Sequence, residues 1–389
     1  MISTENFKVM SFKIEELFTA HYGHAPEVII KSPGRINIIG EHTDYNDGFV
    51  LPAAIDHNMY IGVAKRDDQK VVVHSINYEQ TEEVDLTDVA RTSNDWLNLI
   101  VGVVSQMKSK ISGFDLAFGG NIPEGAGLSS SAALCCGVAS AISELFKLKL
   151  EKWDIIKIAQ RSEHDYALVE CGIMDQFACM FGLTNHVLLL DCKSLTFQES
   201  EFDLGGYKFI LLNSNVKHNL VESDYNVRKR ESADALKVLK SMRPRVESFQ
   251  EVQLKMLEEL KVKMPTKLWK RAYHIVSENQ RVLNVNVELK TGNYEHVGRL
   301  LTEGHASLKD YYEVTCLESD FLVDELNKSP IVLGARQVGG GFGGCILALV
   351  KDMDVDYVIE QVSASYKKAF SIKLDNIPIK IARGCHRIK

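Results

Sequence analysis

Asn121-Ile-Pro-Glu-Gly-Ala-Gly-Leu-Ser-Ser-Ser-Ala132 joins two glycines to three consecutive serines and runs into an apolar segment of small residues, 133–146, that is typical of a helix. The first turn of a helix leaves backbone N–H groups unpaired at the positive end of the helix dipole, where phosphate binds well. Gly125 and Gly127 lack the Cβ that would keep a phosphate away from the main chain. The three serines can cap the helix, bind phosphate or ligate Mg²⁺. The stretch therefore predicts either an anion site or a glycine-rich turn with a serine N-cap.

The segments on either side of this loop favour the anion site. Residues 114–118 form an expected strand that leads into the loop, so the loop lies between a strand and a helix. No Gly-Lys-Ser/Thr and no Asp-Phe-Gly sequence occurs, which excludes the P-loop and the protein-kinase signature. Trp96 opens an expected helix over 96–108, and its ring belongs either to the core or to an adenine-stacking site. Glu163 lies on the polar side of an expected helix over 154–169.

A dense polar stretch lies upstream and reads Ser32-Pro-Gly-Arg-Ile-Asn-Ile-Ile-Gly-Glu-His-Thr-Asp-Tyr-Asn-Asp-Gly-Phe-Val-Leu-Pro52. Strand alternation can hold its polar groups against a core without burying all of them. Glu41, His42 and Asp44 are close enough in sequence to offer donors and acceptors to the several hydroxyls of a sugar. The alternative is a solvated loop in which His42 is a structural histidine.

Two further stretches carry candidate functional residues. Asp175 is the one acid in the otherwise apolar run 171–177, where an aspartate is costly to bury unless it is paired or has a task. It is expected either to begin a helix or to act in catalysis. The glycine run Gly334-Ala-Arg-Gln-Val-Gly-Gly-Gly-Phe-Gly-Gly-Cys345 precedes an expected strand over 346–350. It indicates either a second loop beside a phosphate or a sharp turn between strands.

The 389 residues have the composition of an ordinary soluble chain, 45% hydrophobic and 25% charged, and are enough for two domains. The net charge of −7 argues against nucleic acid or anionic membranes as partners, so any phosphate site must be local. Residues 1–10 lack a basic segment followed by an apolar one, and no apolar run of about 18 residues occurs, so we expect a cytoplasmic protein. The eight cysteines form no Cys-x-x-Cys pair and are expected to be reduced core thiols. No obligate protein partner is evident.

Strands and helices alternate along the chain, which predicts an α/β (α+β) fold. Strands are expected at 27–31, 60–64, 71–74, 187–191 and 208–213. The second and third of these are expected to pair across the turn 66–68. Further helices are expected at 219–239, 269–289 and 294–307. A helix over 355–370 between strands at 346–350 and 377–383 would form a closing β-α-β unit. Leu204-Gly-Gly206 marks the expected boundary between a domain of residues 1–205 and one of residues 206–389.

Taken together, these stretches resemble the GHMP small-molecule kinases, and within them the galactokinases very closely, in motif order as well as in composition. The segment 33–48 is similar to the galactokinase sugar signature, 125–132 to the family's nucleotide loop, and 339–344 to its C-terminal glycine loop. The stretches 171–176, 213–215 and 225–228 also agree, so the resemblance covers about residues 27–350. It implies two α/β lobes with the site between them. The N-terminal lobe would resemble ribosomal protein S5 domain 2, and the C-terminal lobe would be ferredoxin-like.

The resemblance also implies a reaction and a role for each motif residue. Galactokinases phosphorylate the anomeric hydroxyl of α-D-galactose with ATP and Mg²⁺, giving galactose 1-phosphate in the Leloir pathway. Asp175 would be the base that faces O1 of the sugar, and Arg35 would stabilise charge on that oxygen and on the phosphoryl group. The residues that would hold Mg²⁺ are Ser131 and Glu163. The residues that would hold the sugar are Glu41, His42, Thr43, Asp44, Gly172 and Tyr225. The residues that would hold the nucleotide are Ser75, Trp96, Gly125, Ala126, Gly127, Leu128, Ser129, Ser130 and Ser131.

Two alternatives fit many of the same residues. A kinase for a related sugar, such as N-acetylgalactosamine, would differ in the space around the C2 substituent, which residue spacing does not reveal. A non-catalytic sensor would bind galactose and ATP without turnover and signal to a transcriptional partner. The presence of Asp175, Arg35 and all three loop serines argues against the sensor, because the groups that do the chemistry are all retained.

Overall fold

The computed structural model describes residues 7–216 and 221–389, and their strands form three sheets. The largest sheet has the spatial order β13 (His386–Arg387), β1 (Val28–Asn37), β3 (Pro52–Lys65), β6 (Phe114–Gly120), β4 (Lys70–Ser75) and β5 (Gln80–Asp85). Its neighbouring strands are antiparallel except for β4 and β6, which are parallel. The second sheet has the order β10 (Val332–Gln337), β11 (Cys345–Lys351), β9 (Tyr207–Asn213) and β12 (Asp375–Asn376). The smallest sheet has the order β2 (Phe49–Val50), β7 (His186–Asp191) and β8 (Thr196–Glu201).

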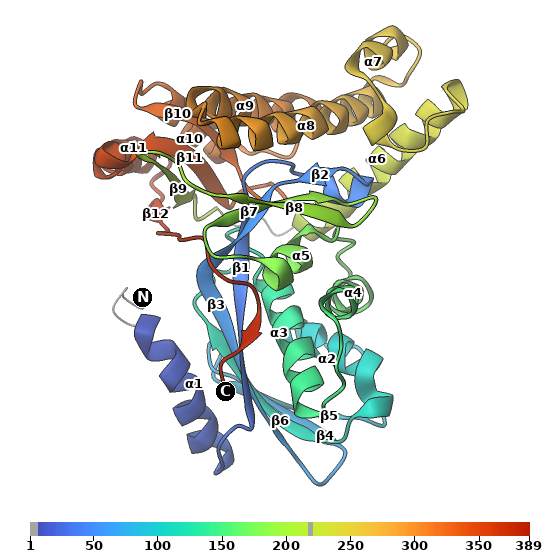
Figure 1. Cartoon of the computed structure of the whole chain (residues 1–389), viewed down its shortest axis with the longest axis vertical. Coiled ribbons are helices and arrows are strands. Elements are labelled where there is room, and N and C mark those ends of the chain that lie inside the picture. Colours follow the sequence, from blue (N-terminus) through green and yellow to red (C-terminus); the bar gives the residue numbers. More distant parts are fainter. Residues whose placement is uncertain (1–6, 217–220) are drawn as a thin grey trace.

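Helices cover both faces of the six-stranded sheet (Figure 1). The helices on one side are α2 (Asp95–Met107), α3 (Ser130–Leu145), α4 (Lys152–Ser162) and α5 (Met174–Phe181). Helix α1 (Phe7–Tyr22) covers the opposite face. Successive strand residues point to opposite faces, so Ile30 packs in the large core on the α3 side while its neighbour Ile29 packs against Phe18 of α1. The alternating side chains of β1 therefore pack into two different hydrophobic clusters, one on each face of the sheet.

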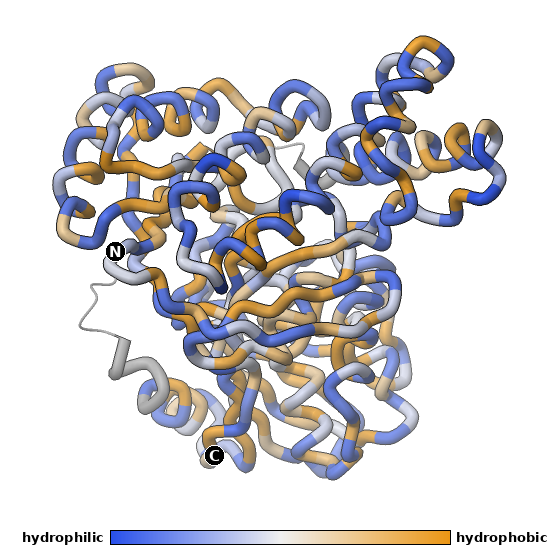
Figure 2. Tube along the Cα trace, turned by 45° about the horizontal axis from the view of Figure 1, so that its top comes forward, coloured by the Kyte–Doolittle hydropathy of each residue, from blue (hydrophilic) through white to orange (hydrophobic). Residues whose placement is uncertain are grey.

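The second half of the chain is built around the four-stranded sheet. Its helices are α6 (Val221–Met242), α7 (Leu254–Leu260), α8 (Thr266–Thr291), α9 (Tyr294–Ser307), α10 (Leu317–Asn327) and α11 (Val355–Phe370). Helices α10 and α11 share an apolar cluster with β10 and β11, while α8 and α9 contribute to the large core of the first half. Figure 2 shows hydrophobic residues concentrated along the strands. Within the described ranges, none of the helices combines the length and the apolarity needed to cross a membrane.

Most expected elements are confirmed. The expected helices at 96–108, 269–289, 294–307 and 355–370 correspond to α2, α8, α9 and α11, and the strand expected at 114–118 is β6. The expected helix over 154–169 is interrupted: α4 ends at Ser162, and a wider π-helical turn follows over Glu163–Ala167. The helix expected from 219 corresponds to α6, but its first two residues lie outside the described part of the chain.

The expected pairing of 60–64 with 71–74 is wrong, because β6 lies between β3 and β4. All seven residues of β6 are buried, so this strand belongs in the interior of the sheet with a neighbour on each side. The turn at 66–68 therefore joins strands that are near each other but not adjacent.

The expected strand over 377–383 is also wrong. Only Asp375–Asn376 form β12, which pairs with β9. Pro378 has no N–H to donate to a ladder, and the chain then crosses to the first sheet through one bridge between Ile381 and Ile55. The chain reaches β1 again as β13, which lies at the edge of the six-stranded sheet.

Candidate functional site

Three adjoining cavities share Ser131 in their walls, and two of them are lined by segments of both halves of the chain. The glycine cavity, of about 540 Å³, lies between the loop 123–131 and the glycine run 338–344. The aromatic cavity, of about 490 Å³, includes the rings of Tyr78, Trp96 and Phe118 in its wall. The polar cavity, of about 150 Å³, is lined among others by Glu41, His42, Asp44 and Tyr225. Arg35 and Asp175 line both the glycine and the polar cavity, and Ser131 lines all three. The three cavities therefore form one continuous site.

Asp175 lies in the first turn of α5 at the junction of the glycine and polar cavities. Its two carboxylate oxygens accept from Nε and Nη2 of Arg35, at 2.8 and 2.9 Å. The Ser129 hydroxyl donates to the same carboxylate at 2.5 Å. Arg35 also donates to the backbone oxygen of Gly127. This geometry holds the carboxylate in one orientation at the place where the two cavities open into each other.

The loop before α3 turns through three residues with positive φ. Gly125, Gly127 and Ser129 have φ of 68°, 72° and 61°, and α3 begins at Ser130. The Ser129 side chain makes no capping hydrogen bond, so the simple serine N-cap is not what it forms. A Cβ at Gly127 would lie 3.0 Å from the backbone oxygen of Val338, so the two glycine loops approach each other closely here.

The residues of the loop 40–49, called the polar loop below, are held by bonds within the loop and by their neighbours. His42 has φ of 63°, and its Nδ1 lies 2.7 Å from the Tyr45 hydroxyl, whereas its buried Nε2 has no hydrogen-bond partner among the described residues. Burial, then the charge of His274, holds the pKa of His42 well below its usual value, so its ring is neutral. A neutral ring with an unpaired buried nitrogen can bind a hydroxyl group.

Four carboxylates line the polar cavity: Glu41, Asp44, Glu163 and Asp175. Burial, followed by the charge of Asp175, raises the pKa of Asp44 to about 7 and that of Glu163 to about 7. Gly172 leaves room for Asp44, because a Cβ at 172 would lie 2.0 Å from its Oδ2. Burial and mutual repulsion therefore disfavour the ionised forms of Asp44 and Glu163.

Glu163 is buried, and both oxygens of its carboxylate accept hydrogen bonds. Its Oε2 accepts from the Ser131 hydroxyl at 2.9 Å, and its Oε1 accepts from Gln176 at 2.7 Å. Within residues 7–216 and 221–389, no group of three or more His, Cys, Asp or Glu side chains could hold a metal ion. Two oxygen ligands fit Mg²⁺, which keeps several waters and takes further oxygens from substrate phosphates.

Two aromatic residues, Trp96 and Tyr78, line the aromatic cavity, and the sequence indicates only Trp96. The rings of Trp96 and Tyr78 are nearly parallel, at 14°, with centroids 6.2 Å apart. Trp96 is partly exposed and lines the cavity, so its ring is available to a ligand as well as packed on Phe118. Tyr78 carries no sequence pattern that marks it. Ser75, expected near a nucleotide, is buried outside the three cavities and accepts from the N–H of Tyr78 at 3.4 Å.

Three other expected site residues, Thr43, Ala126 and Leu128, differ in whether they line a cavity. The Thr43 hydroxyl lies 2.8 Å from the backbone oxygen of Gly40 and 2.7 Å from that of Phe49, so it ties the polar loop together and does not line the polar cavity. Ala126 is buried and lines none of the three cavities, whereas Leu128 lines the glycine cavity. These positions shape the loops that carry the functional groups.

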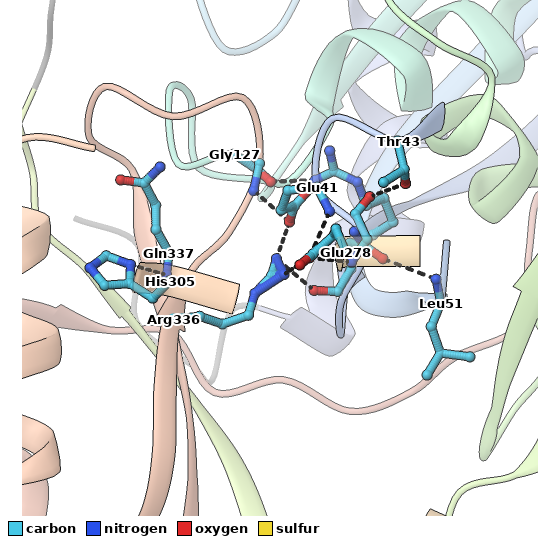
Figure 3. A network of polar contacts seen from close by, with 12 residues as sticks. Glu41, Thr43, Leu51, Gly127, Glu278, His305, Arg336 and Gln337 are labelled. Carbon is cyan, nitrogen blue, oxygen red and sulfur yellow. Dashed lines mark hydrogen bonds and ion pairs between the residues drawn. The ribbon is translucent and has the colours of Figure 1, made fainter. Parts of the chain in front are cut away.

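A buried charge network behind the polar loop was missed from the sequence. Arg336 of β10 pairs with Glu41, and Glu278 of α8 accepts from the backbone of the polar loop (Figure 3). The signal that could have indicated Arg336 is a single arginine at the edge of an apolar strand beside the glycine run. No comparable signal marks Glu278.

Family models match three parts of the chain. They describe the galactokinase galactose-binding signature at residues 16–65, the N-terminal domain of GHMP kinases at 98–183 and the C-terminal domain of GHMP kinases at 285–368. The first match contains the polar loop, and the second contains the glycine-serine loop and Asp175.

Relatives and solved structures agree with these matches. A galactokinase of Thermotoga neapolitana is 42% identical over 92% of this chain and 99% of the relative. A galactokinase of Clostridium acetobutylicum is 38% identical over 97% of each chain. The crystal structure of Lactococcus lactis galactokinase complexed with galactose has a TM-score of 0.93 at 36% identity, and covers 97% of this chain and 99% of that chain. A mevalonate kinase of L. major shares the fold alone, with a TM-score of 0.61 at 16% identity.

Proposed function

The chain belongs to the galactokinases of the GHMP kinase family, and we propose that it transfers the γ-phosphoryl group of ATP to the anomeric hydroxyl of α-D-galactose. The products are galactose 1-phosphate and ADP. The observation that carries this proposal is the position of Asp175, which faces both the polar and the glycine cavity and is held there by Arg35 and Ser129. A sugar hydroxyl in the first cavity and a phosphoryl group in the second would meet at this carboxylate.

The polar cavity takes the sugar in this proposal. Galactose offers several hydroxyls, and the side chains of Glu41, His42, Asp44 and Tyr225 offer matching donors and acceptors around a small space. At about 150 Å³ this cavity is the smallest of the three, in keeping with a single small sugar as its ligand.

Asp175 acts as the base for the attacking hydroxyl. Its carboxylate accepts the proton of the anomeric O–H as the bond from that oxygen to the γ-phosphorus forms and the bond to the ADP oxygen breaks. Arg35 lies beside the same carboxylate and stabilises the negative charge that develops on the transferring group. The chemistry depends mainly on position and charge, which is why a rigidly held carboxylate suffices.

ATP occupies the other two cavities. The backbone N–H groups at the start of α3 and the glycine runs receive the phosphates, and the adenine lies against Trp96 and Tyr78. Ser131 and Glu163 would hold Mg²⁺, which supplies charge neutralisation on the phosphates. Because the reaction consumes ATP, we place the protein in the cytoplasm.

The test is product identification with purified protein, ATP, Mg²⁺ and a panel of sugars at equal concentration. We expect ADP release that depends on galactose and a product phosphorylated at C1, with a much lower rate for N-acetylgalactosamine. Absence of turnover in well-folded protein that binds galactose and ATP in a calorimeter would refute the proposal and support the sensor. A higher rate with another sugar would replace galactose as the substrate.

A further inference from the structure

One face of helix α8 shapes the polar loop from the other half of the chain. His274, Glu278 and Val282 are four residues apart and lie on the same side of the helix. The Nε2–H of His274 donates to the backbone oxygen of Glu41 at 3.1 Å, since a carbonyl can only accept. Val282 lies against Gly40, where an added Cβ would be 2.9 Å from its Cγ2. The conformation of the loop is therefore matched to this helix face.

Glu278 binds the backbone of the loop directly. Its Oε1 accepts from the N–H of Gly40 at 3.0 Å and of Glu41 at 3.4 Å, while its Oε2 accepts from Nε of Arg281 at 2.7 Å. Burial alone would raise the pKa of Glu278, but Arg281 and the other positive charges nearby lower it to about 2, so the side chain is ionised. A charged acceptor binds two successive N–H groups more strongly than a neutral one would.

The buried guanidinium of Arg336 connects Glu278 to the side chain of Glu41 (Figure 3). Its Nη1 lies 3.9 Å from Oε1 of Glu278, and its Nη2 donates to Oε1 of Glu41. The N–H of Gly339 donates to the same Glu41 oxygen at 3.0 Å. Glu41 lines the polar cavity, so with Oε1 occupied its second oxygen is left for a ligand. Nε and Nη1 of Arg336 have no hydrogen-bond partner among the described residues, so the two carboxylates and a 3.4 Å bond from Nη2 to the backbone oxygen of Asn37 hold this cation.

We propose that Glu278 is a positioning residue for the sugar: from α8 it fixes the backbone at Gly40 and Glu41 and, through Arg336, aims the Glu41 carboxylate into the polar cavity. The proposal rests on the assignment of the polar cavity to the sugar. Glu278 itself does not line that cavity and acts only through the loop. If Glu278 loses its charge, Glu41 is the one carboxylate left beside Arg336, and the polar loop loses a charged acceptor at the N–H groups of Gly40 and Glu41.

The experiment compares Glu278→Gln with wild-type protein and with Glu288→Gln as a matched control. Glu288 is on the same helix and pairs with His296 at 2.8 Å, away from the three cavities. For Glu278→Gln we expect the galactose KM and the calorimetric galactose Kd to rise about tenfold or more, which corresponds to the loss of one charge-assisted interaction. We expect kcat at saturating galactose and the ATP KM to stay within about twofold, as for an interaction made equally in ground and transition states. For the control Glu288→Gln, we expect the galactose KM and Kd, kcat and the ATP KM to equal those of wild type.

A double-variant cycle separates positioning from general destabilisation. If Glu278 acts through Glu41, adding Glu278→Gln to Glu41→Gln changes the galactose Kd much less than it does in wild type. An equal effect in both backgrounds, or an unchanged galactose Kd in folded Glu278→Gln, overturns the proposal. If Glu278→Gln does not fold, Glu278→Asp keeps the charge but withdraws it by one methylene, and an unchanged galactose Kd in that variant overturns the proposal as well. Galactose binding without turnover in the wild type would refute the proposed function, while the calorimetric comparison would still test Glu278.

Discussion

Replacing Asp175 by asparagine removes the proposed base and keeps the shape of the side chain. The amide oxygen can still accept one bond from Arg35, but in either orientation the NH₂ group faces the other Arg35 donor. We expect kcat to fall by about 10²–10⁴, which is about 2.7–5.4 kcal/mol on the barrier. The same substitution removes a charge that raises the pKa of Asp44 and of Glu163, so both pKa values should fall below about 7.

The assay is galactose-dependent ADP release, with galactose and ATP affinities measured by calorimetry and the carboxyl titrations followed by NMR. Asp165→Asn is the matched control, because Asp165 is an exposed acid paired with Arg161 at 3.0 Å outside the three cavities. We expect both affinities of Asp175→Asn to remain within about threefold of wild type, since the loss concerns the chemical step. A kcat within tenfold of wild type would remove Asp175 from the mechanism.

Three further predictions concern the metal, the sugar and the nucleotide. Since the raised pKa of Glu163 is about 7, protons compete with Mg²⁺ below that pH, and the Mg²⁺ concentration for half-maximal rate should be about tenfold higher at pH 6 than at pH 8. Glu163→Gln should raise that concentration and abolish its pH dependence; an unchanged dependence would contradict the assignment. Gly172→Ala should raise the galactose KM about tenfold or more, because the new methyl would lie 2.0 Å from Asp44, and an unaltered KM would contradict the packing of this pair. Trp96→Ala should raise the ATP KM about tenfold through lost stacking and leave the galactose KM unchanged; equal effects on both would point to a structural role.

The elements of the fold could largely be predicted because their signals are local. The small-residue run after the serines gives α3, and the apolar run before the loop gives β6. Strand order could not be predicted in the same way. The strands at 60–64 and 71–74 are neighbours in sequence, but a third strand from 114–120 pairs with both. The hydrophobic period and the strand propensity of a segment predict that it is a strand, but they do not determine which strand it pairs with.

The residues of the candidate site likewise differ in whether a local sequence signal marks them. Asp175 stands out locally as the one acid in an apolar run, whereas the roles expected of Arg35 and Glu163 follow from the family resemblance. Glu278 and Arg336 meet Glu41 only because α8 and β10 pack against a loop more than two hundred residues earlier in the chain. Such contacts have no local signature.

The pairing of β13 with β1 has a consequence for how the protein is made. Arg387 lies opposite Ile30, so the edge of β1 at Ile30 and Lys31 stays open until residue 387 has been synthesised. An unpaired strand edge is a template for association with other chains. While the second half is still being translated, the nascent first half therefore exposes this edge, and chaperone binding or misassembly is expected to occur there first.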